Sequence, residues 1–196
     1  MKKGCSGLIV VLVILAILVV WGIKAYNSMV KQREAVNTAW SNVENTYQRR
    51  ADLIPNLVST VKGYAKHEQS TLEGVVEARA KATQIKVDPA NLDEASLKKF
   101  NDAQGELGSA LGKLLMIQEN YPNLKANENF LELQSQLEGT ENRINVARSN
   151  FNDTAKNYNT YLQKFPNNVI SGLFGFKTKP YFEASAGAET APKVEF

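Results

Sequence analysis

The only histidine of this 196-residue chain, His67, limits the catalytic chemistry that the sequence can support. A zinc metalloprotease helix needs His-Glu-x-x-His, but Glu68 is followed by the residues QST, so the second histidine is missing. A di-iron helical bundle needs two Glu-x-x-His pairs, and Tyr64 stands three residues before the histidine. We therefore expect no metal and no cofactor, and a structural role or a rim position for His67.

The sequence supports nucleophilic catalysis no better than it supports metal-dependent catalysis. A Ser-His-Asp or Cys-His set would have to use the same imidazole, and the only cysteine, Cys5, precedes a long apolar run. A hydrolase with two carboxylates remains an alternative for any chain with 20 Asp and Glu, but no spacing indicates such a pair. The sequence predicts a protein that is not an enzyme.

Three glycines, Gly105, Gly108 and Gly112, precede Lys113 and superficially resemble a phosphate-binding loop. The phosphate-binding motif has four residues between its glycines and Ser or Thr after the lysine; here the gap is three and Leu114 follows. The glycines lie three and four apart in a helical pattern. We expect them to form a groove of small residues where another helix approaches closely.

Glu68 is the most informative carboxylate, because helical spacing from Leu57 places it, together with Arg79, among apolar positions of one helix. Eleven residues of helix separate the two by about 16 Å, so each needs partners on other helices. One interpretation is a buried polar network that fixes helix register; the other is a polar ligand or ion site inside the bundle. The residues that enter either interpretation are Arg33, Trp40, Glu68, Arg79, Arg143 and Arg148.

Two further features have a structural and a functional interpretation. Trp40 is expected in the core instead of in a ligand site. Arg49 and Arg50 precede Asp52, which is a good helix N-cap, so we expect a solvated helix end with favourable C-terminal charges. Contact with an acidic partner is the alternative for the two arginines.

The element that must position all of these residues begins with an uncharged apolar run, residues 7–23. A helix of this length spans about 25 Å, and flanking residues extend it toward a hydrocarbon core of about 30 Å. A cleaved signal peptide is the alternative, but the run is long for one and no small-x-small cleavage site follows it. We expect a flank over 1–6 and a single transmembrane helix over 7–25.

The orientation of this span is poorly specified by charge. Lys2 and Lys3 precede it, while Lys24, Lys31 and Arg33 follow it. A short Lys-Lys segment before an uncleaved core resembles a signal anchor, so we expect the remaining domain on the outer side of a cytoplasmic membrane. The single cysteine rules out an intrachain disulfide and does not identify the compartment.

Apolar periodicity predicts four helices after the span. The first continues from Lys24 to Leu53 without Gly or Pro, and the second runs from Asp52 to Gln84 with Pro55 in its first turn. The third begins near Asn91, has Asp93 and Glu94 in its first turn, and buries a stripe of apolar residues: Leu97, Phe100, Ala103, Leu107, Ala110 or Leu111, Leu114 and Ile117.

The fourth helix is expected from its cap Asn127 to Phe165 and carries a seven-residue apolar repeat. The repeat consists of Phe130, Leu137, Ile144, Phe151, Tyr158 and Phe165, with Leu133, Thr140, Ala147, Thr154 and Tyr161 three residues further on. Packing within the chain and coiled-coil dimerisation both predict such a repeat, and we favour packing within the chain.

After Pro166 the chain is too apolar for a free tail, and we expect it to fold back onto the bundle end or, alternatively, to dip into the membrane face. The last residues, 184–196, are predicted to be disordered. Residues 24–196 hold 21 Lys and Arg against 20 Asp and Glu, which excludes a basic surface for nucleic acid and gives no polybasic stripe for anionic lipid.

The sequence DLIPNLV at 52–58, continued by TVKGY at 60–64 and HE at 67–68, resembles the signature of the LemA family of bacterial membrane proteins. The likeness extends from 26 to 183; further matching pieces are 39–40, 49–50, 78–79, 121–122, 124–127, 140–141, 143–144, 147–148 and 165–166. It implies one amino-terminal span and an antiparallel helical bundle, and it supplies no activity. Glu44-Asn45 and the extreme tail depart from the family pattern.

Together these features predict an all-α protein: a single N-terminal transmembrane helix followed by an elongated antiparallel up-and-down four-helix bundle (26–183) with a short C-terminal cap. We expect a non-enzymatic interaction or assembly protein of the envelope, with the bilayer and either a protein partner or a second copy as partners. The alternative is a sensor-like bundle that binds a small ligand or ion near Glu68 and Arg79.

Overall fold

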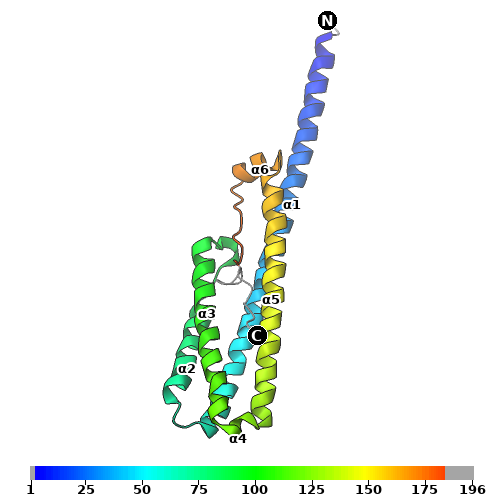
Figure 1. The fold of residues 1–196 in the computed structure, drawn as a ribbon. Coiled ribbons are helices and arrows are strands. Elements are labelled where there is room, and N and C mark those ends of the chain that lie inside the picture. Colours follow the sequence, from blue (N-terminus) through cyan, green and yellow to red (C-terminus); the bar gives the residue numbers. More distant parts are fainter. Residues whose placement is uncertain (1–2, 184–196) are drawn as a thin grey trace, which may run out of the picture.

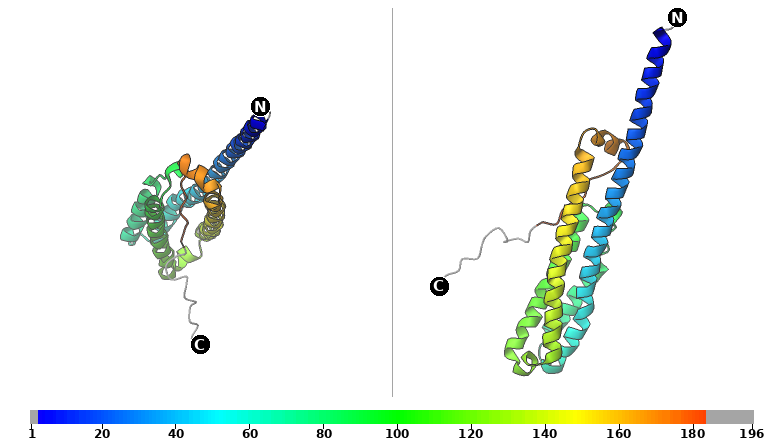
Figure 2. Two further views of the ribbon diagram at one scale, coloured as in Figure 1. Left: turned by 90° about the horizontal axis from the view of Figure 1, so that it is seen from above. Right: turned by 90° about the vertical axis from the view of Figure 1, so that its right-hand side faces the viewer.

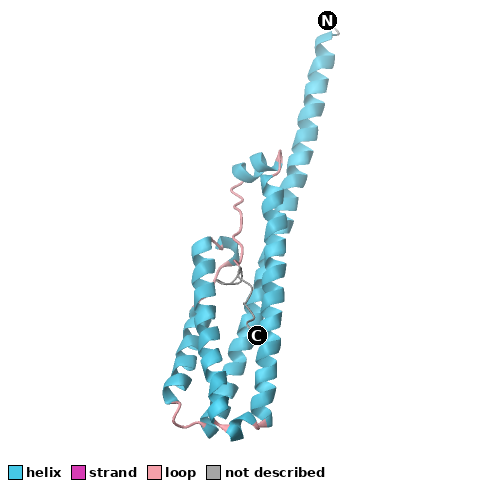
Figure 3. Ribbon diagram, in the orientation of Figure 1, coloured by secondary structure: helices cyan, strands magenta, loops and turns pink. Residues whose placement is uncertain are grey.

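The computed structural model describes residues 3–183, which are helical over most of their length and contain no β-strand (Figures 1 and 3). The helices are α1 (Lys3–Tyr64), α2 (Gln69–Gln84), α3 (Glu94–Met116), α4 (Pro122–Lys125), α5 (Glu128–Gln163) and α6 (Asn167–Leu173). Two short 3₁₀ turns, η1 (Pro89–Asn91) and η2 (Ile117–Asn120), flank α3. The predicted tail, 184–196, lies outside the described residues.

Helix α1 contains both the apolar run and the first helix of the bundle. Every large apolar side chain from Ile9 to Val20 is more than half exposed, while Met29, Val36 and Trp40 are fully buried. The first part of α1 therefore projects beyond the other helices (Figures 1 and 2). By length and composition, α1 is the one helix in residues 3–183 that could cross a membrane.

The predicted boundary between the first and second helices at Asp52 is wrong. Helix α1 continues through Pro55 to Tyr64, and the chain turns at residues 65–68 before α2 begins at Gln69. The physical reason is packing: Ile54, Leu57 and Val61 continue the buried face of α1, so helix is retained although proline removes one hydrogen bond.

The bundle has up-and-down topology, with α1 antiparallel to α2 and to α5, and α2 antiparallel to α3 (Figures 1 and 2). The expected cap of the fourth helix, Asn127, is confirmed, whereas the third helix begins later than predicted, because Asp93 is its N-cap and not part of its first turn. Asp93 and Ser96 form a capping box at the start of α3, and the Asn127 side chain accepts a hydrogen bond from the Phe130 amide at the start of α5.

The main positions of the seven-residue repeat of α5 are buried as far as Tyr158, and the repeat fails only at its end. Phe130, Leu137, Ile144, Phe151 and Tyr158 are buried, as are Thr140 and Ala147, but Phe165 lies beyond the helix and is exposed. The last turns of α5 also bury Ala155, Asn159 and Leu162. An ideal helix drifts by about 20° per heptad against a strict 3.5-residue repeat, so the buried face moves along the sequence.

After α5 the chain folds back onto the bundle end, as one of the two alternatives predicts. Helix α6 caps the upper end of the α1–α5 pair in Figure 1, and an extended strap, residues 175–183, then descends along α5. The side chains of Asn152 and Asn159 hold the strap through hydrogen bonds to the backbones of Phe182 and Lys179.

The buried apolar residues form two clusters, which we call the upper core and the lower core after Figure 1. The upper core joins α1, α3, α5 and the strap, and includes Met29, Val36, Trp40, Val43, Tyr47, Phe100, Ile144, Phe151, Tyr158 and Phe182. The lower core is formed by residues of α1, α2, α3, α4 and α5. It includes Ile54, Leu57, Val61, Leu72, Val75, Leu107, Leu111, Leu114, Leu124 and Phe130.

Candidate functional site: a buried arginine and an open groove between α3 and α5

Arg79 compensates for the proline inside α1. Pro55 has no N–H, so it leaves the carbonyl of Ala51, four residues earlier, without its helical donor. The guanidinium Nε of Arg79 on α2 donates to this carbonyl at 2.7 Å. Because Ala51 is buried, an unsatisfied carbonyl would be costly there. Arg79 thus joins α2 to α1 at the proline.

Glu68 occupies a different place from the one predicted. It lies in the turn between α1 and α2 at the lower end of the molecule, partly exposed, and accepts a hydrogen bond from the Tyr121 hydroxyl at 3.2 Å. The prediction that Glu68 and Arg79 lie on one helix seam is wrong, because α1 ends only at Tyr64. The two side chains share no site, which removes the basis for a ligand site between them.

The other arginines that the sequence singled out are dispersed along α1 and α5. Arg33 of α1 lies over the Phe176 ring, 5.4 Å from its centroid. Arg148 of α5 lies 4.7 Å from the Phe182 centroid and donates to the Glu183 carbonyl. Arg143 is exposed on α5. The six candidate residues therefore do not converge on one network.

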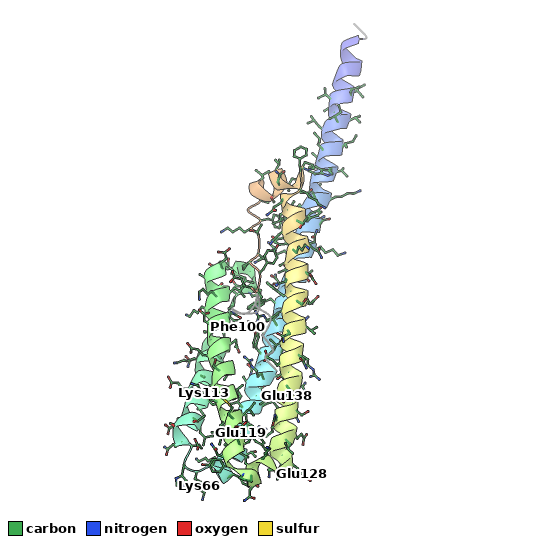
Figure 4. All side chains as sticks on the ribbon, viewed as in Figure 1. Lys66, Phe100, Lys113, Glu119, Glu128 and Glu138 are labelled. Carbon is green, nitrogen blue, oxygen red and sulfur yellow. The ribbon has the colours of Figure 1, made fainter. Side chains whose placement is uncertain are left out.

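Trp40 is a core residue, as expected. Its ring packs edge to face on Phe100 and Phe151, with centroids 5.2 and 5.6 Å away, and stacks on Phe182 at 5.9 Å. Figure 4 places Phe100 near the upper end of α3. The cluster draws its rings from α1, α3, α5 and the strap, so Trp40 holds together segments that are distant in sequence.

Arg50 is the buried charge that sequence reasoning missed. It was expected at a solvated helix end, but its exposed fraction is 5% because α1 continues past it. Its guanidinium donates to the Glu141 carboxylate on α5 at 3.0 Å, and to the Gln104 backbone and side-chain oxygens on α3 at 3.1 and 2.9 Å. The spacing Val43, Tyr47, Arg50, Ile54 would have revealed it in a continuous helix.

Arg50 bridges two helices that otherwise stand apart. In the part of the chain that the structure describes, α1 lies against α5 and α2 lies against α3 with close backbone contacts, whereas α3 and α5 have at most isolated ones. The predicted close approach of a helix to Gly105, Gly108 and Gly112 is therefore wrong. No atom outside the helix backbone lies within 4 Å of where a Cβ would stand on any of the three.

These glycines instead face an open groove of about 850 Å³ between α3 and α5. Its lining is apolar in part, from Leu111, Leu115 and Leu137, and Arg50 and Tyr47 also contribute to it. Four carboxylates stand on its two sides: Asp102 and Glu106 on α3, Glu138 and Glu141 on α5. Glu138, labelled in Figure 4, lies on the α5 side.

Burial determines the protonation state of the tyrosine that lines the groove. Burial raises the pKa of the Tyr47 hydroxyl, and the nearby positive charges of Arg148 and Arg50 only partly oppose this, so the phenol is neutral at ordinary pH. Within residues 3–183, no three His, Cys, Asp or Glu side chains are grouped to hold a metal ion. The groove offers an acidic rim, a partly apolar floor and glycine backbone to a binding partner.

Comparison with known proteins gives the chain its family. Two magnetosome proteins, MamQ 2 of Paramagnetospirillum magneticum (strain ATCC 700264 / AMB-1) and MamQ of Magnetospirillum gryphiswaldense (strain DSM 6361 / JCM 21280 / NBRC 15271 / MSR-1), are each 28% identical over 182 residues, covering 84% of this chain and 67% of the relative. Protein LemA of Metamycoplasma hominis (strain ATCC 23114 / DSM 25592 / NBRC 14850 / NCTC 10111 / PG21) is 23% identical over 159 residues, covering 81% and 69%.

The family model described as LemA family matches residues 39–196. This match includes residues 184–196, whereas the resemblance based on short motifs ended at residue 183. It contains Pro55 and Arg79, the Arg50 bridge and both sides of the groove. Since the match covers most of the sequence, the chain belongs to the LemA family.

Proposed function

We propose that this protein is a single-pass, membrane-anchored interaction or assembly protein of the bacterial envelope, without enzymatic activity. One observation carries the proposal: the exposed apolar segment and the buried core face belong to the same uninterrupted helix, α1. A continuous helix transmits the orientation of the span to the bundle, as expected of a protein that displays a surface at a fixed distance from the bilayer.

The groove between α3 and α5 is the surface that we propose a partner occupies. Its rim carries Asp102, Glu106, Glu138 and Glu141, and its cations, Arg50 and Arg148, are already engaged with Glu141 and the Glu183 carbonyl. The complementary occupant is a protein segment with apolar residues and an excess of Lys or Arg. The open glycine backbone would admit such a segment closely.

The anchoring part of the proposal is tested by accessibility of a thiol. A Cys5→Ser, Ser149→Cys variant carries one cysteine on an exposed position of α5. A membrane-impermeant maleimide added to intact cells should label it if the bundle lies outside, as we propose. Recovery of the protein in the soluble fraction would contradict anchoring, and labelling only after lysis would place the bundle inside.

The interaction part is tested with p-benzoylphenylalanine in place of Gly108, and in place of Gly74 on exposed α2 as the matched control. Both positions have open space, so neither change should disturb the fold. Irradiation of native membranes should give a discrete crosslinked adduct from position 108 alone. The crosslink should map to a Lys- or Arg-rich segment of the partner. The double change Glu106→Gln and Glu138→Gln should lower the yield of this adduct. Adducts from both positions, or only with the chain's own residues 184–196, would contradict a partner in the groove.

A further inference from the structure

The C-terminal cap has an exposed apolar face, of which the other described residues cover only part, at the Phe174 ring. Phe165, Val169, Leu173 and Phe174 are 83%, 63%, 78% and 58% exposed, whereas Ile170 and Ser171 of the same segment are buried. Val169 and Leu173 are four residues apart in α6, a spacing typical of one helix face, and Phe165 and Phe174 lie just before and just after this helix. An exposed patch of this kind marks an interaction surface.

The position of the cap relative to α1 indicates what covers this face. A Cβ placed on Gly22 would lie 3.9 Å from Cδ1 of Ile170, and the Tyr26 ring packs edge to face on Phe174 and Phe176 at 4.9 and 5.5 Å. The cap is therefore fixed at the level of residues 22–26, where the apolar run of α1 ends. Figures 1 and 2 show α6 beside α1 at this level.

The length of the apolar run brings the bilayer to the same level. Residues 7–23 rise by about 25 Å as a helix, less than the hydrocarbon thickness of about 30 Å. A short span draws its flanking residues toward the membrane interface. Gly22 and Tyr26 then lie at the boundary between acyl chains and headgroups, and α6, in contact with both, lies there too.

The charge distribution fits the same surface. The sequence has no Asp or Glu in 1–33 or in 154–182, the two segments that form the upper end of the bundle. Five lysines in the described part of these segments are exposed: Lys24, Lys31, Lys156, Lys164 and Lys177. The balanced composition of the whole chain predicted no basic surface for lipid, but the fold gathers acid-free segments at one end. Interfacial helices combine an apolar face with such lysines.

We infer that α6 and its flanking aromatic residues form a second membrane contact, with Phe165, Val169, Leu173 and Phe174 inserted at the boundary of an anionic bilayer. This inference rests on the proposed membrane anchoring of α1. The span and the cap together would fix both the tilt and the rotation of the bundle, since two contacts define its orientation where a single helix leaves it free to rotate.

The test uses the full chain in vesicles of equimolar phosphatidylcholine and phosphatidylglycerol, with Cys5→Ser and one introduced cysteine carrying the fluorophore NBD. The label is placed at Leu173→Cys on the cap face, Leu15→Cys in the span, or Ser149→Cys on α5. Vesicles with brominated acyl chains quench only labels that reach the hydrocarbon. We expect blue-shifted, quenched emission at positions 15 and 173, and unshifted, unquenched emission at position 149.

The outcomes separate the inference from the anchoring on which it depends. Quenching at position 15 without quenching at 173 overturns the cap contact and leaves the anchor intact, while no quenching at 15 overturns the anchor. A blue shift at 173 that brominated lipid does not quench means that protein covers the face, which also overturns the inference.

A charge placed in the cap face provides the second arm. With the label at Val169→Cys, the further change Leu173→Asp should abolish the quenching, because it puts a carboxylate into the inserted face. The control Leu131→Asp changes a half-exposed leucine on α5, at the other end of the bundle, and should leave the quenching unchanged. Equal quenching in both variants would contradict insertion of this face.

Discussion

The upper and lower cores stabilise the same bundle in different ways. The lower core is largely aliphatic and comes from helices that follow one another closely in the chain. The upper core is built around aromatic rings, and its central contact joins Trp40 of α1 to Phe182 of the strap. Local helical pairing thus suffices at one end, whereas the other end depends on contacts between segments far apart in sequence.

The change expected to separate the two cores most strongly is Trp40→Ala. Removing a fully buried tryptophan from a core costs about 3–5 kcal/mol, and here it leaves Phe100, Phe151 and Phe182 without their common neighbour. We expect the free energy of unfolding, measured by denaturant titration of the full chain in detergent, to fall by this amount. Hydrogen exchange should rise in the strap and upper α5 first; an equal rise in α2 would contradict independent cores.

The matching change in the lower core is Leu57→Ala, which should cost about 2–4 kcal/mol, because a fully buried leucine leaves a cavity. Exchange should then rise in α2, α4 and lower α3, with the strap protected. Denaturant unfolding measures the loss of free energy of unfolding, and hydrogen exchange shows which helices are destabilised. Loss of protection in the strap at the same level as in α2 would show that the two cores unfold as one.

Arg50 lies between the two cores, so its removal tests their coupling. Arg50→Met keeps much of the side chain's length but leaves the Gln104 side-chain oxygen without its donor and the Gln104 carbonyl with its helical donor alone, at a cost of about 2 kcal/mol. Unfolding should become less cooperative as α3 and α5 separate. The control Glu141→Gln should cost under about 1 kcal/mol, because that carboxylate is half exposed. Equal effects of both changes would contradict this role.

The smallest expected effect concerns Arg79. Arg79→Met should cost about 1–2 kcal/mol by leaving the buried Ala51 carbonyl unsatisfied. In a Pro55→Ala background the new amide of residue 55 can donate to that carbonyl, so most of the cost should disappear. A double-mutant cycle from denaturant unfolding measures the coupling. Additive costs would show that Arg79 acts independently of the proline.

Much of the fold was predictable because local rules decided it. The cap Asn127, the buried stripe of α3 and the apolar run of α1 were all identified from spacing and residue type, and Asp93 was placed near the start of its helix although not as the cap. The boundary at Asp52 was misplaced because Asp-x-x-Pro is also a good helix start. That one error hid Arg50, which seemed to end a helix, and moved Glu68 onto a seam where it does not lie.

The site was less predictable than the fold. Gly105, Gly108 and Gly112 were correctly placed on one helix, but whether a helix covers them depends on how α3 sits relative to α5. The acid-free upper end could not be found from composition, since its two segments are more than a hundred residues apart in sequence. Neither property follows from any single segment.

The sequence by itself determined the all-helical class, the cap Asn127 and the apolar run, because each depends on hydrogen bonding and periodicity within a short stretch of chain, and its short motifs gave the family. Only the tertiary structure decided that Arg79 satisfies the carbonyl freed by Pro55, that Arg50 spans an open groove, and that the cap lies level with the end of the apolar run. These are distances between segments remote in sequence, and packing of the whole bundle sets them.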